Sequence, residues 1–65
     1  MVKVETKCGY DIYELTEQEC EENFYEYPCF CAVYEGEDFD GAGHEECSVG
    51  SLNELLDWCK EYGRN

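Results

Sequence analysis

The stretch TEQECEENFYEYP, residues 16–28, contains five glutamates and no lysine or arginine. Carboxylates at this density can accept charge-assisted hydrogen bonds from the guanidinium and ammonium groups of a basic partner. A second acidic segment, residues 35–46, follows in the sequence. Tyr25 lies in the first segment and is an amphipathic residue of the kind enriched in protein interfaces. The predicted partner-binding residues are Glu17, Glu19, Glu21, Glu22, Tyr25, Glu26, Glu35, Glu37, Asp38, Asp40, Glu45 and Glu46.

The spacing of the glutamates in the first segment is unfavourable for the stability of a helix. Two pairs are four residues apart, Glu17 with Glu21 and Glu22 with Glu26. On a helix each such pair of like charges costs about a few tenths of a kcal/mol, whereas a lysine in one position would make the pair favourable. A docking surface for a basic groove explains this choice. The alternative is a solvated acidic face that keeps a small protein soluble and monomeric.

The cysteines allow two further kinds of chemistry. Their number, six in 65 residues, is even and permits complete pairing in disulfides. The first ten residues, MVKVETKCGY, lack the apolar segment and cleavage site of a secretory signal. If the chain is complete, free thiols in a reducing cytoplasm are therefore the favoured interpretation, whereas a removed signal would favour disulfides.

A zinc site is the second possibility for the cysteines. The candidate ligands are Cys29, Cys31, His44 and Cys47, with Cys20 or Cys59 as substitutes. The spacing of His44 and Cys47 suits zinc, but zinc sites usually place two to four residues between paired cysteines and this first pair has one. Buried thiols or disulfides are the favoured interpretation, and we expect neither a metal nor a cofactor.

Calcium binding and catalysis are both disfavoured by the motifs. Asp38, Asp40 and Gly41 match the third, fifth and sixth positions of a calcium loop, but Gly36 and Cys47 then occupy its first and last positions, where carboxylates are required. No nucleophile elbow, phosphate loop, metalloprotease helix or CxxC motif is present. We therefore do not expect an enzyme.

The charge balance restricts the possible partners. Seventeen acidic residues against four basic ones give a net charge of −13, and the cations are Lys3, Lys7, Lys60 and Arg64. Such a field repels nucleic acids and anionic lipids and attracts basic protein surfaces. No apolar run reaches the roughly 18 residues that a membrane span needs. At this length the chain is predicted to form a single compact domain, residues 1–65.

The elements that must position these residues begin with a strand and a helix. Residues 2–12 alternate between apolar and polar, with Asp11 on the polar side, which predicts one strand in which Gly9 marks a bulge or bend. Thr16 and Glu19 form a capping box that begins a helix, and Pro28 ends it. The helical stripe predicted to face the sheet comprises Cys20, Phe24 and Tyr27.

The second half of the chain predicts a strand, a hairpin and a helix. Residues 29–35 are apolar on both faces, which is typical of a central strand, and residues 47–49 are expected to pair back with it. Ser51 and Glu54 repeat the capping box. The following helix, which Gly63 ends, has an apolar stripe of Leu52, Leu55, Leu56, Cys59 and Tyr62. The predicted fold class is α+β, in the order β-α-β-(β)-α, with two short helices over one side of a two- or three-stranded sheet.

These features together lead to one expectation about function. Carboxylates can imitate the phosphate charges of a nucleic acid and occupy the basic groove of a nuclease or similar enzyme. Small size and extreme acidity are the general character of the decoy inhibitors that phages use against CRISPR effectors and restriction enzymes, and we expect such a role in the host cytoplasm. The alternative is a structural or interaction module stabilised by disulfides or zinc.

Overall fold

The structure, a computed structural model, describes residues 1–39 and 43–63. Over these two ranges the chain forms one antiparallel sheet of four strands in the order β1-β2-β3-β4, together with two helices. The elements are β1 (Val2–Lys7), β2 (Tyr10–Leu15), α1 (Glu17–Glu22), β3 (Cys29–Tyr34), β4 (Cys47–Val49) and α2 (Leu52–Tyr62). The α+β class is confirmed. The sheet exceeds the predicted two or three strands because the first predicted strand is a hairpin.

This hairpin turns at Cys8 and Gly9. Both residues have positive φ, 53° and 86°, as the two central positions of a type I′ turn require, and Lys7 pairs with Tyr10 across it. The prediction of one strand over residues 2–12 is therefore wrong. Residues that pair across a two-residue turn point to the same face of the sheet, so the alternation reverses its phase there. Thr6 and Asp11, which a single strand would place on opposite faces, are paired with each other in the structure.

The beginning of α1 follows the predicted capping box. The Glu19 amide donates to Thr16 Oγ1 at 3.1 Å, and the Thr16 amide donates to Glu19 Oε1 at 2.9 Å. These two bonds satisfy backbone donors that the first turn of a helix leaves without partners. Local chemistry thus determines where the helix starts.

The end of α1 differs from the prediction. The helix stops at Glu22, where the amides of Phe24 and Tyr25 donate to the carbonyls of Glu21 and Cys20, at 3.5 and 2.8 Å. These two bonds define a Schellman motif, whose residue with positive φ is usually glycine. Here it is Phe24, with φ of 64°. The stop was not predicted because the expected glycine is absent from the sequence.

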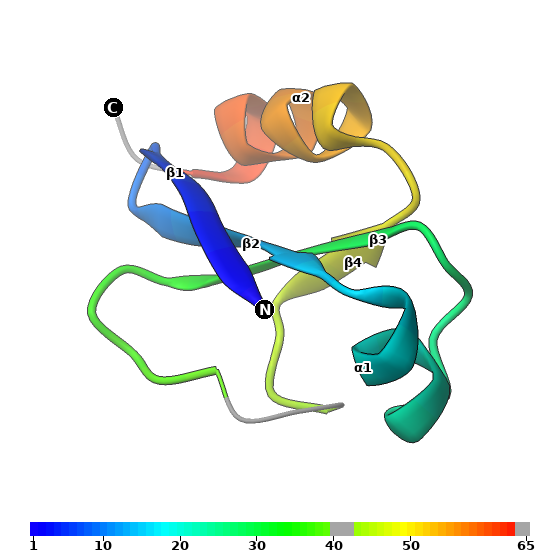
Figure 1. The fold of residues 1–65 in the computed structure, drawn as a ribbon. Coiled ribbons are helices and arrows are strands. Elements are labelled where there is room, and N and C mark those ends of the chain that lie inside the picture. Colours follow the sequence, from blue (N-terminus) through cyan, green and yellow to red (C-terminus); the bar gives the residue numbers. More distant parts are fainter. Residues whose placement is uncertain (40–42, 64–65) are drawn as a thin grey trace.

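The two helices lie on opposite faces of the sheet, with α2 above it and α1 below it in Figure 1. The prediction that both cover one side is therefore wrong. The core cluster on the α2 side contains Tyr10, Ile12, Ala32, Leu55 and Cys59. The core cluster on the α1 side contains Leu15, Cys20, Cys29, Cys31, Val33 and Phe39. Strand β3 contributes to both clusters, as expected of a central strand.

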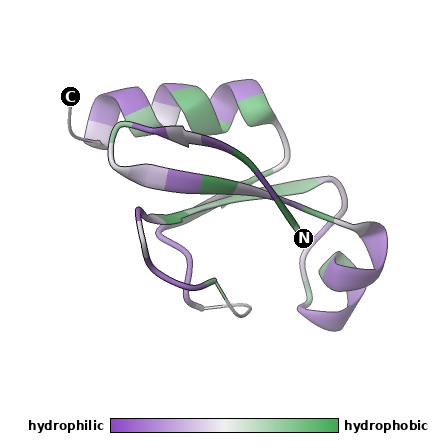
Figure 2. Ribbon diagram, turned by 60° about the vertical axis from the view of Figure 1, so that its left-hand side comes forward, coloured by the Kyte–Doolittle hydropathy of each residue, from purple (hydrophilic) through white to green (hydrophobic). Residues whose placement is uncertain are grey.

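The helices differ in how much they bury. Along α2, hydrophilic and hydrophobic residues alternate, whereas α1 is mostly hydrophilic (Figure 2). In α2 Leu55 and Cys59 are fully buried as the predicted stripe requires, but Tyr62, which was predicted to belong to the same stripe, is 62% exposed. Ser51 is the N-cap as predicted, although its side chain makes no capping hydrogen bond. Neither helix in the described ranges has the length and apolar character required to cross a bilayer.

Gly63 allows the end of α2 to lie directly against the β1–β2 turn. A Cβ at this position would lie 2.4 to 2.5 Å from the Cys59 carbonyl and from Cys8. We expect Gly63→Ala to lower the free energy of unfolding by about 1 to 3 kcal/mol, because backbone must move apart. Gly50→Ala is the control, since its nearest neighbour would be a carbonyl at 3.5 Å. Urea unfolding measures both variants, and equal stabilities would contradict this close packing.

Candidate partner-binding surface

The two acidic segments are brought to the same side of the sheet. Cys20 of α1 and Phe39 of the second acidic segment pack in one core cluster. Figure 1 shows α1 and this segment below the sheet, on the side opposite α2. Two sequence segments that β3 separates therefore contribute to one surface, which we call the α1-side surface.

The exposed carboxylates of the α1-side surface have few cations near them. They are Glu17, Glu21, Glu22, Glu26, Glu35, Glu37, Asp38 and Glu46. Within residues 1–39 and 43–63 none of these forms an ion pair with a lysine or with the terminal amine, because the ion pairs found there join Met1 to Glu19 and Lys3 to Asp11. Of the other predicted residues of this segment, Glu45 is half-buried and Asp40 lies outside the described residues.

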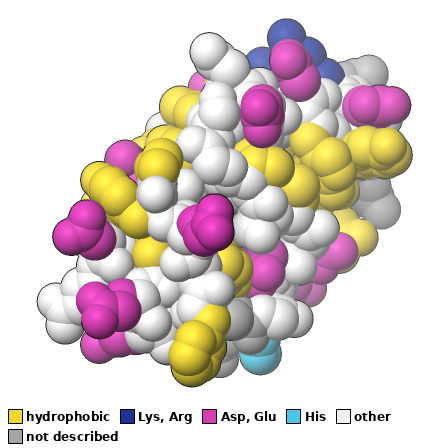
Figure 3. Space-filling model, turned by 90° about the vertical axis from the view of Figure 1, so that its right-hand side faces the viewer, with side chains coloured by type: hydrophobic (Ala, Val, Ile, Leu, Met, Phe, Trp, Pro, Cys, Tyr) yellow, Lys and Arg dark blue, Asp and Glu magenta, His cyan; other side chains and the backbone are white. Residues whose placement is uncertain are grey.

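Acidity also extends beyond this surface. Glu54, Asp57 and Glu61 of α2 are exposed as well. Figure 3 views the molecule from the right-hand side of Figure 1 and shows acidic side chains between hydrophobic patches, with basic side chains at the upper edge. Charge alone therefore does not mark a binding site, and the arrangement of the surface has to be considered.

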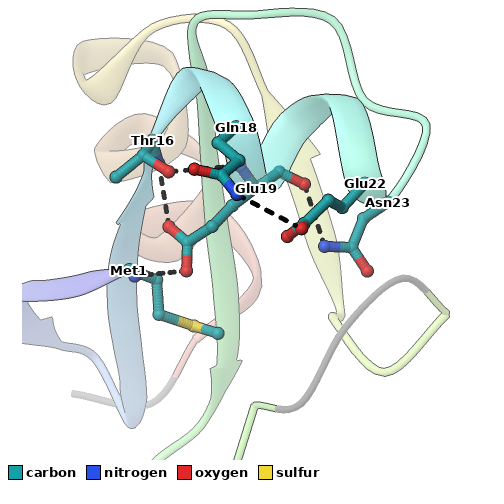
Figure 4. A network of polar contacts seen from close by, with 6 residues as sticks. All are labelled: Met1, Thr16, Gln18, Glu19, Glu22 and Asn23. Carbon is teal, nitrogen blue, oxygen red and sulfur yellow. Dashed lines mark hydrogen bonds and ion pairs between the residues drawn. The ribbon is translucent and has the colours of Figure 1, made fainter.

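Glu19 differs from the other glutamates because it has partners in its own chain. Besides its capping bonds, its carboxylate accepts a hydrogen bond from the α-amino group of Met1 (Figure 4). This bond, followed by the bond from the Thr16 amide, holds the pKa of Glu19 below its ordinary value. Its half-buried side chain stabilises the start of α1 and offers less negative charge to a partner than its exposed neighbours do.

Tyr25 lies against the core rather than on the outer arc of α1, so its predicted placement is wrong. Its ring packs against the α1-side cluster, and its hydroxyl is buried without a hydrogen-bond partner among the described residues. Burial, and then the nearby Glu45 carboxylate, raise the pKa of Tyr25. Glu45 is close enough to exert this effect but lies outside hydrogen-bonding geometry. The contact joins the first acidic segment to the second.

Phe24 takes the exposed position that was predicted for Tyr25. It is 95% exposed, although the helical pattern predicted it to face the sheet. Because α1 ends at Glu22, Phe24 lies beyond the helix, and its positive φ turns the chain so that Tyr25 enters the core. An aromatic ring is thereby held in solvent between Glu22 and Glu26. No signal in the sequence predicted this arrangement.

The residues considered as possible zinc ligands do not come together among the described residues. Cys29 and Cys31 project from β3 into the α1-side cluster, with their Sγ atoms 3.8 Å apart. Cys47 packs on the α2 side of the sheet. Across residues 1–39 and 43–63, no three metal-binding side chains converge on one point. Cys47 is paired with Ala32, whose side chain faces the α2 side, so it lies on the opposite face of the sheet from Cys29 and Cys31.

The cysteines behave as core residues in this structure. All six are in the reduced thiol form, outside any disulfide, and four of them are buried. Burial raises the pKa of the thiols of Cys20, Cys29, Cys31 and Cys59, which keeps them protonated at neutral pH. A neutral buried thiol packs as a small apolar side chain.

The calcium-loop residues Asp40 and Gly41 lie outside the described residues.

Asp11 is a buried carboxylate that the alternating pattern placed on a polar, exposed face. It is 4% exposed and accepts hydrogen bonds from Thr6 Oγ1 at 2.6 Å and from the Gly36 amide at 3.2 Å, while Lys3 Nζ lies 4.0 Å away. The Thr6 bond is the main cause that holds its pKa below the ordinary value, against the effect of burial. Asp11 thus links the first hairpin to the beginning of the second acidic segment.

We expect Asp11→Asn to lower the free energy of unfolding by about 1 to 3 kcal/mol at neutral pH, because buried donors lose a charged acceptor. The folded-state pKa is depressed below 3.8, so the contribution of the carboxylate is present above that pH and is lost as the pH falls through the folded-state value. Thermal unfolding at about pH 7 and about pH 3 should therefore show a smaller difference between variant and parent in acid. Asp57→Asn, at an exposed position, is the control. A difference that does not depend on pH would contradict this role.

No protein-family model, curated protein or solved structure matches this chain. The fold and the surface by themselves define a small α+β domain. It presents an acidic surface with exposed aromatic rings, of which Phe24 is the most exposed. The chemistry of this surface is therefore the basis for a proposal about function.

Proposed function

We propose that this protein binds a basic, nucleic-acid-binding protein and blocks its nucleic-acid site by imitating a phosphate backbone. The observation that supports this proposal is the α1-side surface, where two separate acidic segments share one core cluster and expose carboxylates that form no ion pair with a lysine among the described residues. Mutual repulsion among these charges costs stability, and a cationic partner would relieve it.

The chemistry of a phosphate-binding groove suits such a surface. Duplex DNA presents one negative charge per about 1.7 Å of its axis, and enzymes that process it bind these charges with lysine and arginine. Carboxylates can engage the same side chains through charge-assisted hydrogen bonds, often in bidentate geometry with arginine. The net charge of −13 in turn opposes direct binding of this chain to nucleic acid.

The proposed biological role is inhibition of a nuclease or similar enzyme in the cytoplasm. Its physical type corresponds to phage anti-defence inhibitors of CRISPR effectors or restriction enzymes. No catalytic step by this protein is part of the proposal. Occupation of the groove alone excludes the substrate.

Competition for DNA tests the proposal. The chain is immobilised, a partner is captured from a lysate at low salt and then purified, and its binding to a labelled DNA duplex is titrated with the free chain. We expect displacement of the duplex that weakens steeply as salt rises, because charge pairs dominate the contact. A partner that still binds its duplex at saturating concentrations of the chain would refute the proposal.

A further inference from the structure

The β1–β2 turn and the end of α2 lie at the left of Figure 1. A pocket of about 580 Å³ is lined by residues of both and by the end of β3. Three tyrosines and a glutamate supply its side-chain chemistry, and backbone of the turn and of the helix end completes it. The lining residues are Cys8, Gly9, Tyr10, Tyr34, Glu35, Tyr62 and Gly63. Glu35 is also the first residue of the second acidic segment.

The rings of the pocket belong to a row of four aromatic side chains from three elements. Tyr34 stacks on Tyr10 with centroids 5.5 Å apart, Tyr10 contacts Trp58 at 5.0 Å, and Trp58 contacts Tyr62 at 5.3 Å. Tyr10 is buried, which fixes the middle of the row. The outer rings, Tyr34 and Tyr62, are nevertheless 49% and 62% exposed. Aromatic surface is thus held in place without being covered.

Aromatic faces and a carboxylate together favour a cation. The face of a tyrosine ring is electron-rich and attracts positive charge, and Glu35 adds a full negative charge at the rim. Among the described residues that line the pocket there is no lysine or arginine. An anion would therefore meet repulsion, and an apolar ligand would remove water from the carboxylate without replacing its hydrogen bonds.

A guanidinium group fits these features better than an ammonium group does. It is flat, it stacks on aromatic faces, it is weakly hydrated, and it can donate two parallel hydrogen bonds to one carboxylate. A lysine ammonium is strongly hydrated and cannot stack. We infer that this pocket binds the guanidinium group of an arginine side chain presented by the basic partner. This inference rests on the proposed function, because it names one contact of that partner.

The test uses a small probe and needs no partner. N-acetyl-arginine methylamide, its lysine counterpart and its neutral citrulline counterpart are titrated into the labelled protein at about 0.15 M salt, where distant charges are screened. NMR follows the amides of Gly9, Glu35 and Gly63 and the indole of Trp58. We expect saturable chemical-shift changes with the arginine probe. The lysine probe should bind about fivefold more weakly, and the citrulline probe should not bind.

Matched variants locate the binding. Glu35→Gln and Tyr62→Leu should each lower the affinity for the arginine probe about fivefold or more, since each removes a side chain that contacts the guanidinium group. As controls, Glu37→Gln removes an exposed carboxylate and Tyr27→Leu an exposed tyrosine, both outside the pocket. These two variants should leave the affinity for the arginine probe unchanged. Unchanged amide dispersion confirms that each variant is folded.

Two results would overturn the inference. Equal affinities for the arginine and lysine probes, or equal losses in Glu35→Gln and Glu37→Gln, would indicate diffuse attraction to an acidic protein. A failure here can be distinguished from failure of the proposed function. If the chain still displaces duplex DNA from its partner but the arginine probe does not bind in the pocket, the inhibitor proposal is retained and the assignment of the pocket is wrong.

Discussion

Changing Glu21, Glu22 and Glu26 together to lysine is expected to weaken binding to the basic partner by about a hundredfold or more, since like charges brought together at an interface cost several kcal/mol. All three side chains are exposed on the α1-side surface and none pairs with a lysine among the described residues. The loss should appear as a higher concentration needed to displace a labelled DNA duplex from the partner. It should also appear as a weaker dependence of that concentration on salt.

The matched control reverses three exposed carboxylates on the opposite helix, Glu54, Asp57 and Glu61. Each reversal adds two positive charges, so both triple variants have the same net charge, −7 rather than −13. If the α1-side surface is the binding surface, the α2 variant should retain most of its inhibition. Equal losses in the two variants would show that overall acidity, rather than this surface, drives binding.

Stability provides an internal check on the first variant. In α1 the change at Glu21 places a lysine four residues after Glu17, which converts a repulsive pair into an attractive one worth about 0.2 to 0.5 kcal/mol. The free energy of unfolding should therefore rise slightly while binding falls. A variant that loses both binding and stability would show an unfolded protein and would contradict the expectation.

The elements that the sequence predicted correctly are those whose signals are local. The capping box of Thr16 and Glu19 begins α1 as expected. The apolar run predicted at residues 29–35 contains the inner strand β3 (Cys29–Tyr34), and residues 47–49 pair with it. In each case the deciding chemistry lies within a few residues of the element, so a single sequence contains it.

The errors arose where a residue adopts a backbone conformation that is unusual for its type. The turn at Cys8 and the helix end at Phe24 both place a non-glycine residue at positive φ. A sequence pattern assigns such positions to glycine, asparagine or aspartate, so neither was recognised. Because the helix ends earlier than predicted, Phe24 is exposed, and Tyr25, one residue later, packs against the core in its place.

The surface itself could be predicted only in part. Both acidic segments were evident from composition, but their meeting on one face depends on Cys20 and Phe39 packing in a shared cluster. This shared cluster follows from the order and direction of the strands, which the pattern did not determine because the first hairpin was interpreted as one strand. The aromatic pocket was missed for the same reason, since its rings come from three separate elements.

Changing Phe24 to glycine is expected to raise stability and abolish tight binding. A non-glycine residue in the left-handed region costs about 1 to 2 kcal/mol, and the greater freedom of glycine in the unfolded chain offsets part of the gain. Because the ring is 95% exposed, its removal loses little packing. The free energy of unfolding should therefore rise by about 0.5 to 1 kcal/mol. Urea unfolding measures this change.

Binding should change in the opposite direction. Aromatic anchors at the centre of an interface commonly contribute about 2 kcal/mol or more, so we expect roughly a thirtyfold loss in competition with duplex DNA. Phe24→Asn tolerates the same backbone and should lose binding similarly, while Phe24→Trp keeps an aromatic ring and should retain it. A stabilising substitution that damages an interaction indicates that the strained ring is maintained for a partner. Should the glycine variant gain stability and still displace the duplex as well as the parent does, Phe24 would not be the anchor and the contact would rest on the carboxylates alone.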